Sequence, residues 1–223
     1  MPTALITGAS RGIGAAIAAA LAPTHTLLLA ARPSARLEAV ANGLGATSWP
    51  LDLTDTEAIF TYAEDLAELD VLVHNAGVSI PGHVGETNIH DWRATFDANV
   101  LGAVALTLAL LPALRRAHGQ VVFINSGSGR RVSAGMAAYS ASKFALRAFA
   151  DSLRQDEPAL RVTTVYPGRT DTDMQRELVA FEGGDYNPAD FLRPDTVAGI
   201  VASVLSTPPD GHVHEVVIRP RRS

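Results

Sequence analysis

A tyrosine and the only lysine of this 223-residue chain stand four residues apart, in the segment YSASK. On a helix, Tyr139 and Lys143 would share one face, with their side chains adjacent. A free tyrosine has a pKa near ~10, and a neighbouring ammonium lowers that pKa because it stabilises the phenolate. A nearby helix N-terminus acts in the same direction. The pair therefore predicts a tyrosine that serves an alcohol or carbonyl as general base or acid.

The elements that must position this pair can be read from apolar runs, which alternate with helical patterns along the whole chain. The runs are apolar throughout, which indicates strands buried on both faces of a sheet. Strand–helix alternation implies right-handed crossovers and a parallel sheet covered by helices. We predict an α/β fold, a Rossmann-type doubly wound sheet of about seven strands, as a single domain over residues 1–223. The expected strands cover residues 3–7, 25–30, 47–51, 70–75, 120–125, 161–167 and 215–220.

The expected helices have recognisable ends. In DLTDTEAIF, Thr54 is the predicted N-cap and Glu57 completes a capping box. Pro158 ends the helix that carries YSASK. The longest apolar run, residues 100–114, contains Pro112 and is too short to span a membrane, so we interpret it as a buried helix. The other helices are expected over residues 13–21, 34–43 with glycine at the end, 88–116, 139–156 and 195–205, the last started by Arg193–Pro194.

Ligands of such sheets bind beyond the carboxyl ends of the strands, so the first loop, TGASRGIG, is a candidate binding loop. Its glycines at Gly8, Gly12 and Gly14 allow a tight turn, close approach of a pyrophosphate and close helix packing. The following helix start offers free N–H groups and partial positive charge to phosphates. A glycine-rich turn alone is weak evidence, but its place between the first strand and first helix predicts a dinucleotide site.

The end of the second strand bears on which dinucleotide binds. Sites that prefer NAD usually place a carboxylate there to accept from the ribose 2′-OH, whereas this chain has Ala31 and then Arg32. Arg32 can pair bidentately with a 2′-phosphate, and Arg11 in the glycine loop is a second cation. The alternative is that both arginines are simply solvent-exposed. We expect NADP(H) as the cofactor in preference to NAD(H).

The spacing G-x-x-x-G-x-G in TGASRGIG resembles the cofactor signature of the short-chain dehydrogenase/reductase family, in its short single-domain, NADP(H)-preferring type. Further motifs of that family follow in the expected order and cover essentially the whole chain. They are Asp52 in LDLTD, NAG at 75–77, Asn99 in FDANV, Ser126 thirteen residues before Tyr139, and PGRTDT at 167–172.

The resemblance implies roles for four polar side chains, which are the predicted catalytic residues. Tyr139 would be the general acid or base, and Lys143 would also hydrogen-bond the nicotinamide ribose. Ser126 would hydrogen-bond the substrate oxygen, and Asn99 would hold a water that links Lys143 to solvent. Arginine would fit poorly between a phenolate and a ribose. The predicted cofactor contacts are Gly8, Ser10, Arg11, Gly12, Ile13, Gly14, Arg32, Asp52, Leu53, Asn75, Ala76, Gly77, Tyr139, Lys143, Pro167, Gly168, Thr170 and Thr172.

Composition bears on the partners. A net charge of −5 does not suggest nucleic acid or an anionic membrane, and the arginine pairs at 115–116, 130–131 and 221–222 are too short to track phosphates. The chain has no cysteine, which excludes disulfides and thiolate nucleophiles. The N-terminus lacks a signal-peptide pattern, and we expect a cytoplasmic protein. The histidines show no metal-ligand spacing, so no metal is expected.

Substrate and assembly follow less directly from the residues. Residues 78–86, 127–138 and 169–191 are expected to wall a small-molecule carbonyl or alcohol substrate, the last as a lid. An aldehyde, ketone, sugar or 3-hydroxy acid remains possible. Alanines at 138, 141, 145 and 148 and the apolar helix predict an intersubunit bundle in a homodimer or homotetramer, unless they pack on their own sheet. The alternatives to a reductase are a non-catalytic NADP(H) sensor and an epimerase or dehydratase.

Overall fold

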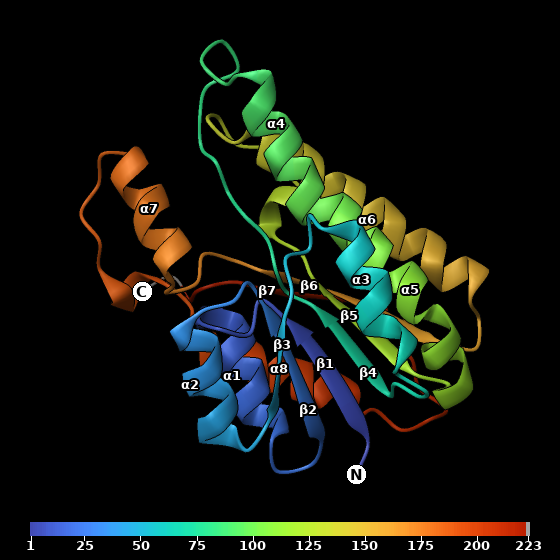
Figure 1. Ribbon diagram of the computed structural model, residues 1–223. Coiled ribbons are helices and arrows are strands. Elements are labelled where there is room, and N and C mark those ends of the chain that lie inside the picture. Colours follow the sequence, from blue (N-terminus) through green and yellow to red (C-terminus); the bar gives the residue numbers. More distant parts are fainter. Residues whose placement is uncertain (222–223) are drawn as a thin grey trace.

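One parallel sheet of seven strands forms the centre of the computed structural model, which describes residues 1–221 (Figure 1). The strand order is β3-β2-β1-β4-β5-β6-β7, and every pairing is parallel. The predicted fold class is confirmed, while Arg222 and Ser223 lie outside the described residues. The strands are β1 (Thr3–Thr7), β2 (Thr26–Ala31), β3 (Thr47–Pro50), β4 (Val71–His74), β5 (Gln120–Ile124), β6 (Arg161–Pro167) and β7 (Glu215–Ile218).

Helices cover both faces of this sheet. One face carries α1, α2 and α8, and the other carries α3, α5 and α6 (Figure 1). The helices are α1 (Gly12–Leu21), α2 (Ala35–Leu44), α3 (Thr56–Glu64), α4 (Ile89–Phe96), the π-helical η1 (Asp97–Leu101), α5 (Gly102–Ala117), the 3₁₀ turn η2 (Gly127–Gly129), α6 (Ala137–Asp156), α7 (Asp173–Phe181), the 3₁₀ turn η3 (Pro188–Asp190) and α8 (Pro194–Leu205).

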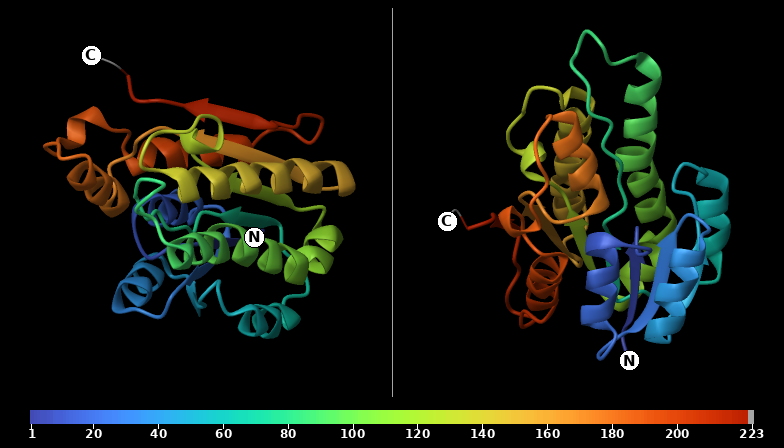
Figure 2. Two further views of the ribbon diagram at one scale, coloured as in Figure 1. Left: turned by 90° about the horizontal axis from the view of Figure 1, so that it is seen from above. Right: turned by 90° about the vertical axis from the view of Figure 1, so that its left-hand side faces the viewer.

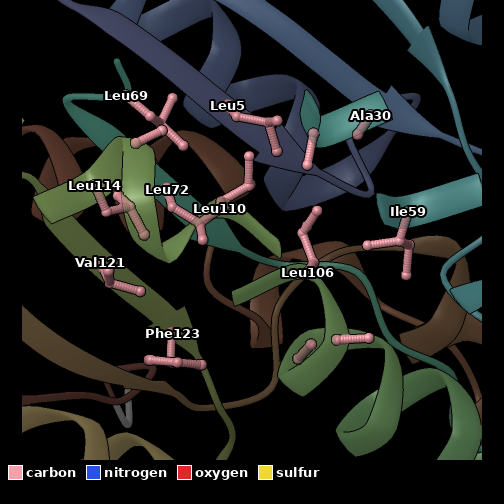
Figure 3. Close-up of a cluster of buried hydrophobic side chains, with 14 of the residues drawn as sticks. Leu5, Ala30, Ile59, Leu69, Leu72, Leu106, Leu110, Leu114, Val121 and Phe123 are labelled. Carbon is pink, nitrogen blue, oxygen red and sulfur yellow. The ribbon is translucent and has the colours of Figure 1, made fainter. Parts of the chain in front are cut away.

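The hydrophobic core is divided by the sheet into two layers. Leu5, Leu72 and Phe123 point toward α3, α5 and α6 (Figure 3). Their strand neighbours Ile6 and Val73 point to the opposite layer, under α1, α2 and α8. Because both faces of the sheet are buried, its central strands carry apolar side chains at consecutive positions rather than only at every second one.

Two helix ends differ from the predictions. Helix α2 runs past Gly43 to Leu44, and Gly45 takes the left-handed conformation that ends it, with φ 62°. Helix α3 is capped by Asp55, whose side chain accepts from the Ala58 amide at 3.0 Å, and not by Thr54. The reason is that Asp52 already engages Thr54, which donates to it from both its amide and its hydroxyl.

The predicted helix over residues 88–116 is continuous from Ile89 to Ala117 and contains the π-helical segment η1. By length and composition alone this helix could cross a membrane. In the structure, however, 56% of its most apolar window is buried, and its halves pack against α3 and α6. A core helix of the domain accounts for these contacts, as the sequence predicted.

Candidate active site

The loops that follow the strands gather at the carboxyl edge of the sheet, and α7 stands beyond that edge (Figures 1 and 2). The chain runs outward from β1 to β3 and then returns to β4 on the other side of β1. This reversal between β1 and β4 is the position at which open α/β sheets bind ligands. All the predicted site residues belong to this edge or to the helices that meet it.

The glycine loop has the close contacts that its sequence predicts. Gly8 and Gly12 both have positive φ, 66° and 57°, which side chains rarely adopt. A Cβ on Gly14 would overlap the carbonyl oxygen of Gly8, so helix α1 could not approach the loop with a larger residue there. Helix α1 begins without a side-chain cap and without an acidic residue in its first turn. Its free N–H groups can therefore serve a phosphate.

The turn after β4 is fastened to the end of β1. The Asn75 side chain donates to the Thr7 carbonyl at 2.9 Å, and the Thr7 hydroxyl accepts from the amides of Asn75 and Ala76 at 2.9 and 3.0 Å. Thr7 was not among the predicted site residues, although a threonine that ends an apolar strand next to the glycine loop is a usable signal. These bonds join two of the predicted cofactor-binding loops into one unit.

Asn99 lies in the π-helical segment η1 and is almost fully buried. Its Nδ2 donates to the Val78 carbonyl at 2.9 Å and to Ser142 Oγ at 3.0 Å, while its Oδ1 accepts from the Val78 amide at 2.7 Å. A π turn inserts a residue into the helical register and often marks a functional site. Asn99 thus connects the segment after the NAG turn with helix α6, which carries Tyr139 and Lys143.

Tyr139 lies in the first turn of α6, and its side chain lies close to that of Ser126, which follows β5. Burial raises the pKa of Tyr139, and the nearby Ser126 hydroxyl acts in the opposite direction. The net rise differs from the lowering that the sequence predicted. The reason is that burial, which residue spacing does not reveal, disfavours the phenolate more than the nearby groups favour it.

Lys143 is buried one turn further along α6, with only 4% of its surface exposed. Its Nζ donates to the Ile124 carbonyl at 3.2 Å and lies 5.8 Å from the centroid of the Tyr139 ring. Burial lowers the pKa of Lys143 to about 8. The ammonium is thus held close to the tyrosine, between the ends of β5 and the NAG turn.

Asn125 is a positioning residue that is not among the site residues predicted from the sequence. It follows β5, its Oδ1 accepts from the Ser126 amide at 2.8 Å, and its Nδ2 donates to the Lys143 carbonyl at 3.0 Å. It therefore fixes Ser126 relative to α6. A Cβ on Gly129 would overlap its Oδ1, so this packing requires glycine in η2. A polar residue at the end of an otherwise apolar strand is the signal that could have identified it.

The residues predicted to bind the adenosine half of the cofactor lie apart from Tyr139 and Lys143. Arg32 follows β2, is exposed, and makes no ion pair within residues 1–221. Arg11 makes an ion pair with Asp173, the first residue of α7. Asp52 accepts from Thr54 through Oδ1, and Leu53 packs against α5 at Gly102. Ser10 lies in the glycine loop, and Ile13 lies in the first turn of α1.

The loop of PGRTDT connects β6 to the glycine loop. The Thr170 hydroxyl donates to the Gly168 carbonyl at 3.0 Å, and the Thr172 hydroxyl accepts from the Gln175 amide as the N-cap of α7. A Cβ on Gly12 would lie 3.3 Å from the Thr172 methyl, so the two loops meet. Pro167, Gly168, Thr170 and Thr172 therefore share an edge with the glycine loop.

The three predicted substrate walls contact one another near the start of α6. Gly82 pairs with Met136 in a short bridge, and the Gly82 amide donates to the Gly135 carbonyl at 2.8 Å. The Phe181 ring, at the end of α7, packs against Gly135 and against His83, with its centroid 5.9 Å from that of the His83 ring. Residues 169–191 were expected only as a lid, and α7 within them was not predicted. Within residues 1–221, no cluster of three or more potential metal ligands occurs.

Sequence comparisons identify relatives of this chain. A profile for short chain dehydrogenases matches residues 2–183. A glycine betaine reductase of Emericella nidulans is 36% identical, with 98% of this chain but 18% of that protein covered. An uncharacterised oxidoreductase of Mycobacterium bovis is also 36% identical, with 98% and 65% covered. The chain thus spans less than two thirds of these two relatives. An uncharacterised oxidoreductase of Staphylococcus saprophyticus is 30% identical, with 97% and 96% covered.

Solved structures share the whole fold. An alcohol dehydrogenase from Thermococcus sibiricus, complexed with 5-hydroxy-NADP, is 30% identical with a TM-score of 0.90, covering 100% of this chain and 99% of that one. A serine dehydrogenase complexed with NADP⁺ is 26% identical with a TM-score of 0.88, covering 97% and 94%. The profile and these relatives agree with the resemblance found in the motifs.

Proposed function

This chain belongs to the short-chain dehydrogenase/reductase family of oxidoreductases, and on that premise we propose that it transfers a hydride between NADP(H) and a carbonyl or secondary alcohol. The observation that carries the proposal is the placement of the Tyr139 side chain beside Ser126, with the buried Lys143 Nζ 5.8 Å from the centroid of the Tyr139 ring. A proton donor, an orienting hydroxyl and a cation are the groups that a carbonyl needs when it becomes an alkoxide.

The loops fit a dinucleotide because no side chain covers the backbone where phosphates must approach. Gly8, Gly12 and Gly14 leave no side chain above the start of α1, where free N–H groups can bind the pyrophosphate. Asn75, Thr170 and Thr172 lie along the same edge toward Tyr139. When bound, the cofactor supplies or accepts the hydride, and the chain supplies the proton.

The protonation states of the site fit a tyrosine that acts as the proton donor when a carbonyl is reduced. Because burial raises the pKa of Tyr139, the phenol holds its proton at neutral pH and can donate it to the substrate oxygen. Ser126 donates to the same oxygen and orients it. Lys143, with a pKa of about 8, is mostly charged at neutral pH and stabilises negative charge that develops on Tyr139.

We further propose NADP(H) over NAD(H), since β2 is followed by Arg32 rather than by a carboxylate and Arg11 stands in the glycine loop. The bound 5-hydroxy-NADP and NADP⁺ of the similar structures support this choice. A panel of carbonyl compounds, assayed with NADPH and with NADH, tests both proposals. We expect turnover with at least one compound and a lower KM for NADPH. Tight NADPH binding without turnover would instead indicate a cofactor sensor, and a lower KM for NADH would refute the preference.

We propose that the protein assembles as a homodimer or homotetramer. We also propose that it is cytoplasmic and acts on a small-molecule substrate. Leu101, Leu108 and Phe144 are 54%, 54% and 41% exposed on the outer side of η1, α5 and α6. Contiguous exposed apolar patches mark protein–protein contacts, and we propose that these three side chains belong to such a patch. Light scattering of the protein in solution tests this proposal, and a monomeric mass would contradict it.

A further inference from the structure

One carboxylate bridges two arginines at the adenosine side of the site. Asp173 Oδ2 accepts from Arg11 Nη1 at 2.5 Å and from Arg36 Nη1 at 3.3 Å. The three residues come from the glycine loop, α2 and α7, and they are far apart in the sequence. Asp173 and Arg11 also line a cavity of about 420 Å³ between the glycine loop, α7 and α8. Neither Arg36 nor Asp173 was a predicted site residue.

The two arginines flank the end of β2, where a ribose of a bound dinucleotide would lie. The Ala9 amide donates to the Ala30 carbonyl at 3.2 Å, so the glycine loop and the end of β2 are adjacent. Arg36 is the second residue of α2, and Arg32 lies four residues before it in the connection from β2. Arg11, Arg32 and Arg36 therefore approach the same region from the two loops that a dinucleotide would contact.

The ion pairs of Asp173 are of the kind that a stronger anion can replace. Side chains of Arg11, Arg36 and Asp173 are 53%, 68% and 47% exposed, so water screens their attraction. Hydrogen bonding from Arg11, and then from Arg36, holds the pKa of Asp173 below its usual range, so its carboxylate is charged at neutral pH. A phosphate monoester carries up to twice the charge and three acceptor oxygens, and it suits guanidinium groups well.

Resting on the NADP(H) preference proposed above, we propose that Arg36 is a third ligand of the cofactor 2′-phosphate and that Asp173 competes with that phosphate for Arg11 and Arg36. Asp173 is then a specificity-determining residue. It weakens binding of the phosphorylated ribose by occupying the cations, and it has no such effect on a ribose with a free 2′-OH. Arg32, which makes no ion pair within residues 1–221, is available to the phosphate without this competition.

The experiment is calorimetric titration of the protein with two probes, adenosine 2′,5′-bisphosphate and 5′-AMP, which differ only by the 2′-phosphate. Wild type is expected to bind the bisphosphate more tightly. Asp173→Asn should tighten bisphosphate binding about fivefold, and Arg36→Gln should weaken it about fivefold, the range of an exposed ion pair. Both variants should leave the dissociation constant of 5′-AMP unchanged. Thermal melts of each variant verify that it is folded.

Asp195→Asn is the matched control, since Asp195 lines the same cavity without an ion pair to either arginine. It should leave bisphosphate binding within about twofold of wild type. An equal gain in Asp195→Asn would overturn the proposal, because the effect would then be general charge repulsion. Weaker bisphosphate binding in Asp173→Asn would also overturn it, since Asp173 would then orient the arginines. Equal binding of both probes by wild type would instead refute the NADP(H) preference itself.

Discussion

At the scale of single residues, the site depends on one ammonium in a confined place. Lys143 is buried between the end of β5 and the NAG turn, with 4% of its surface exposed and its Nζ against the Ile124 carbonyl. A compact cation fits there, whereas a guanidinium needs more space and directs its donors in a fixed plane. The structure therefore gives a steric reason for the single lysine of a chain that otherwise uses arginine.

We predict that Lys143→Arg folds but loses most of its kcat, about 100-fold or more, because the cation no longer reaches its position beside Tyr139. Steady-state kinetics with NADPH measure the loss, and circular dichroism verifies the fold. Arg147→Lys, on the same helix one turn further, is the control and should stay near wild type. Near-wild-type turnover in Lys143→Arg would mean that the lone lysine is a coincidence of composition.

At the scale of elements, the strands and most helices could be predicted because their apolar patterns are strong and local. The N-cap of α3 was placed one residue early because Asp52, Thr54 and Asp55 are all plausible caps, and only the Asp52–Thr54 contacts decide between them. Helix α7 was missed because it is short and stands outside the layered core. Its Thr172 cap is a local signal for this helix, but a lid over residues 169–191 is what the sequence predicts.

The remaining features of the candidate site could not be predicted because they depend on contacts between segments that are distant in the sequence. The bridge from Asp173 to Arg11 and Arg36 joins residues more than a hundred positions apart, so no local pattern encodes it. The burial of Tyr139 likewise depends on the packing of several elements. The motif order placed the polar residues at the right sheet edge, but the sign of the tyrosine pKa shift required the structure.

Substitutions of two helical glycines, one packed against the glycine loop and one exposed, test the packing of that loop. Gly14→Ala would drive a Cβ into the Gly8 carbonyl and should lower both the free energy of unfolding and the affinity for NADPH. Gly43→Ala, in α2, meets nothing within 4 Å and should raise the free energy of unfolding by about 0.5–1 kcal/mol. Urea denaturation and NADPH titration measure both effects. Equal effects of the two variants would contradict the packing described for the loop.

At the scale of the whole molecule, His74 in the buried sheet links folding to pH. His74 of β4 stacks on Phe123 with ring centroids 4.8 Å apart, and its Nε2 shares a hydrogen bond with Thr107 at 2.8 Å. Burial lowers the pKa of His74 to about 3, so the folded protein keeps it neutral. Its Nδ1 is buried without a partner, and a protonated ring would be poorly accommodated.

Because the unfolded chain takes up a proton on His74 below its ordinary pKa of 6.5 and the folded protein does not until about 3, acid destabilises the fold between these values. From this side chain alone, the free energy of unfolding should fall by about 2 kcal/mol between pH 7 and pH 5. Urea denaturation at both values measures it, with His74→Phe as the comparison. The variant should lose less stability over this interval, and an identical loss would show that His74 is not responsible.

The central claim is that the Tyr139 phenol moves the proton during hydride transfer. The most direct test is the turnover of the Tyr139→Phe variant. The substitution removes one hydroxyl from a buried side chain and leaves the ring in place. With the best carbonyl substrate and saturating NADPH, we expect kcat to fall by a factor of about 10² to 10⁴, the usual contribution of a general acid, while NADPH still binds. Turnover at the wild-type rate in this variant would contradict the account.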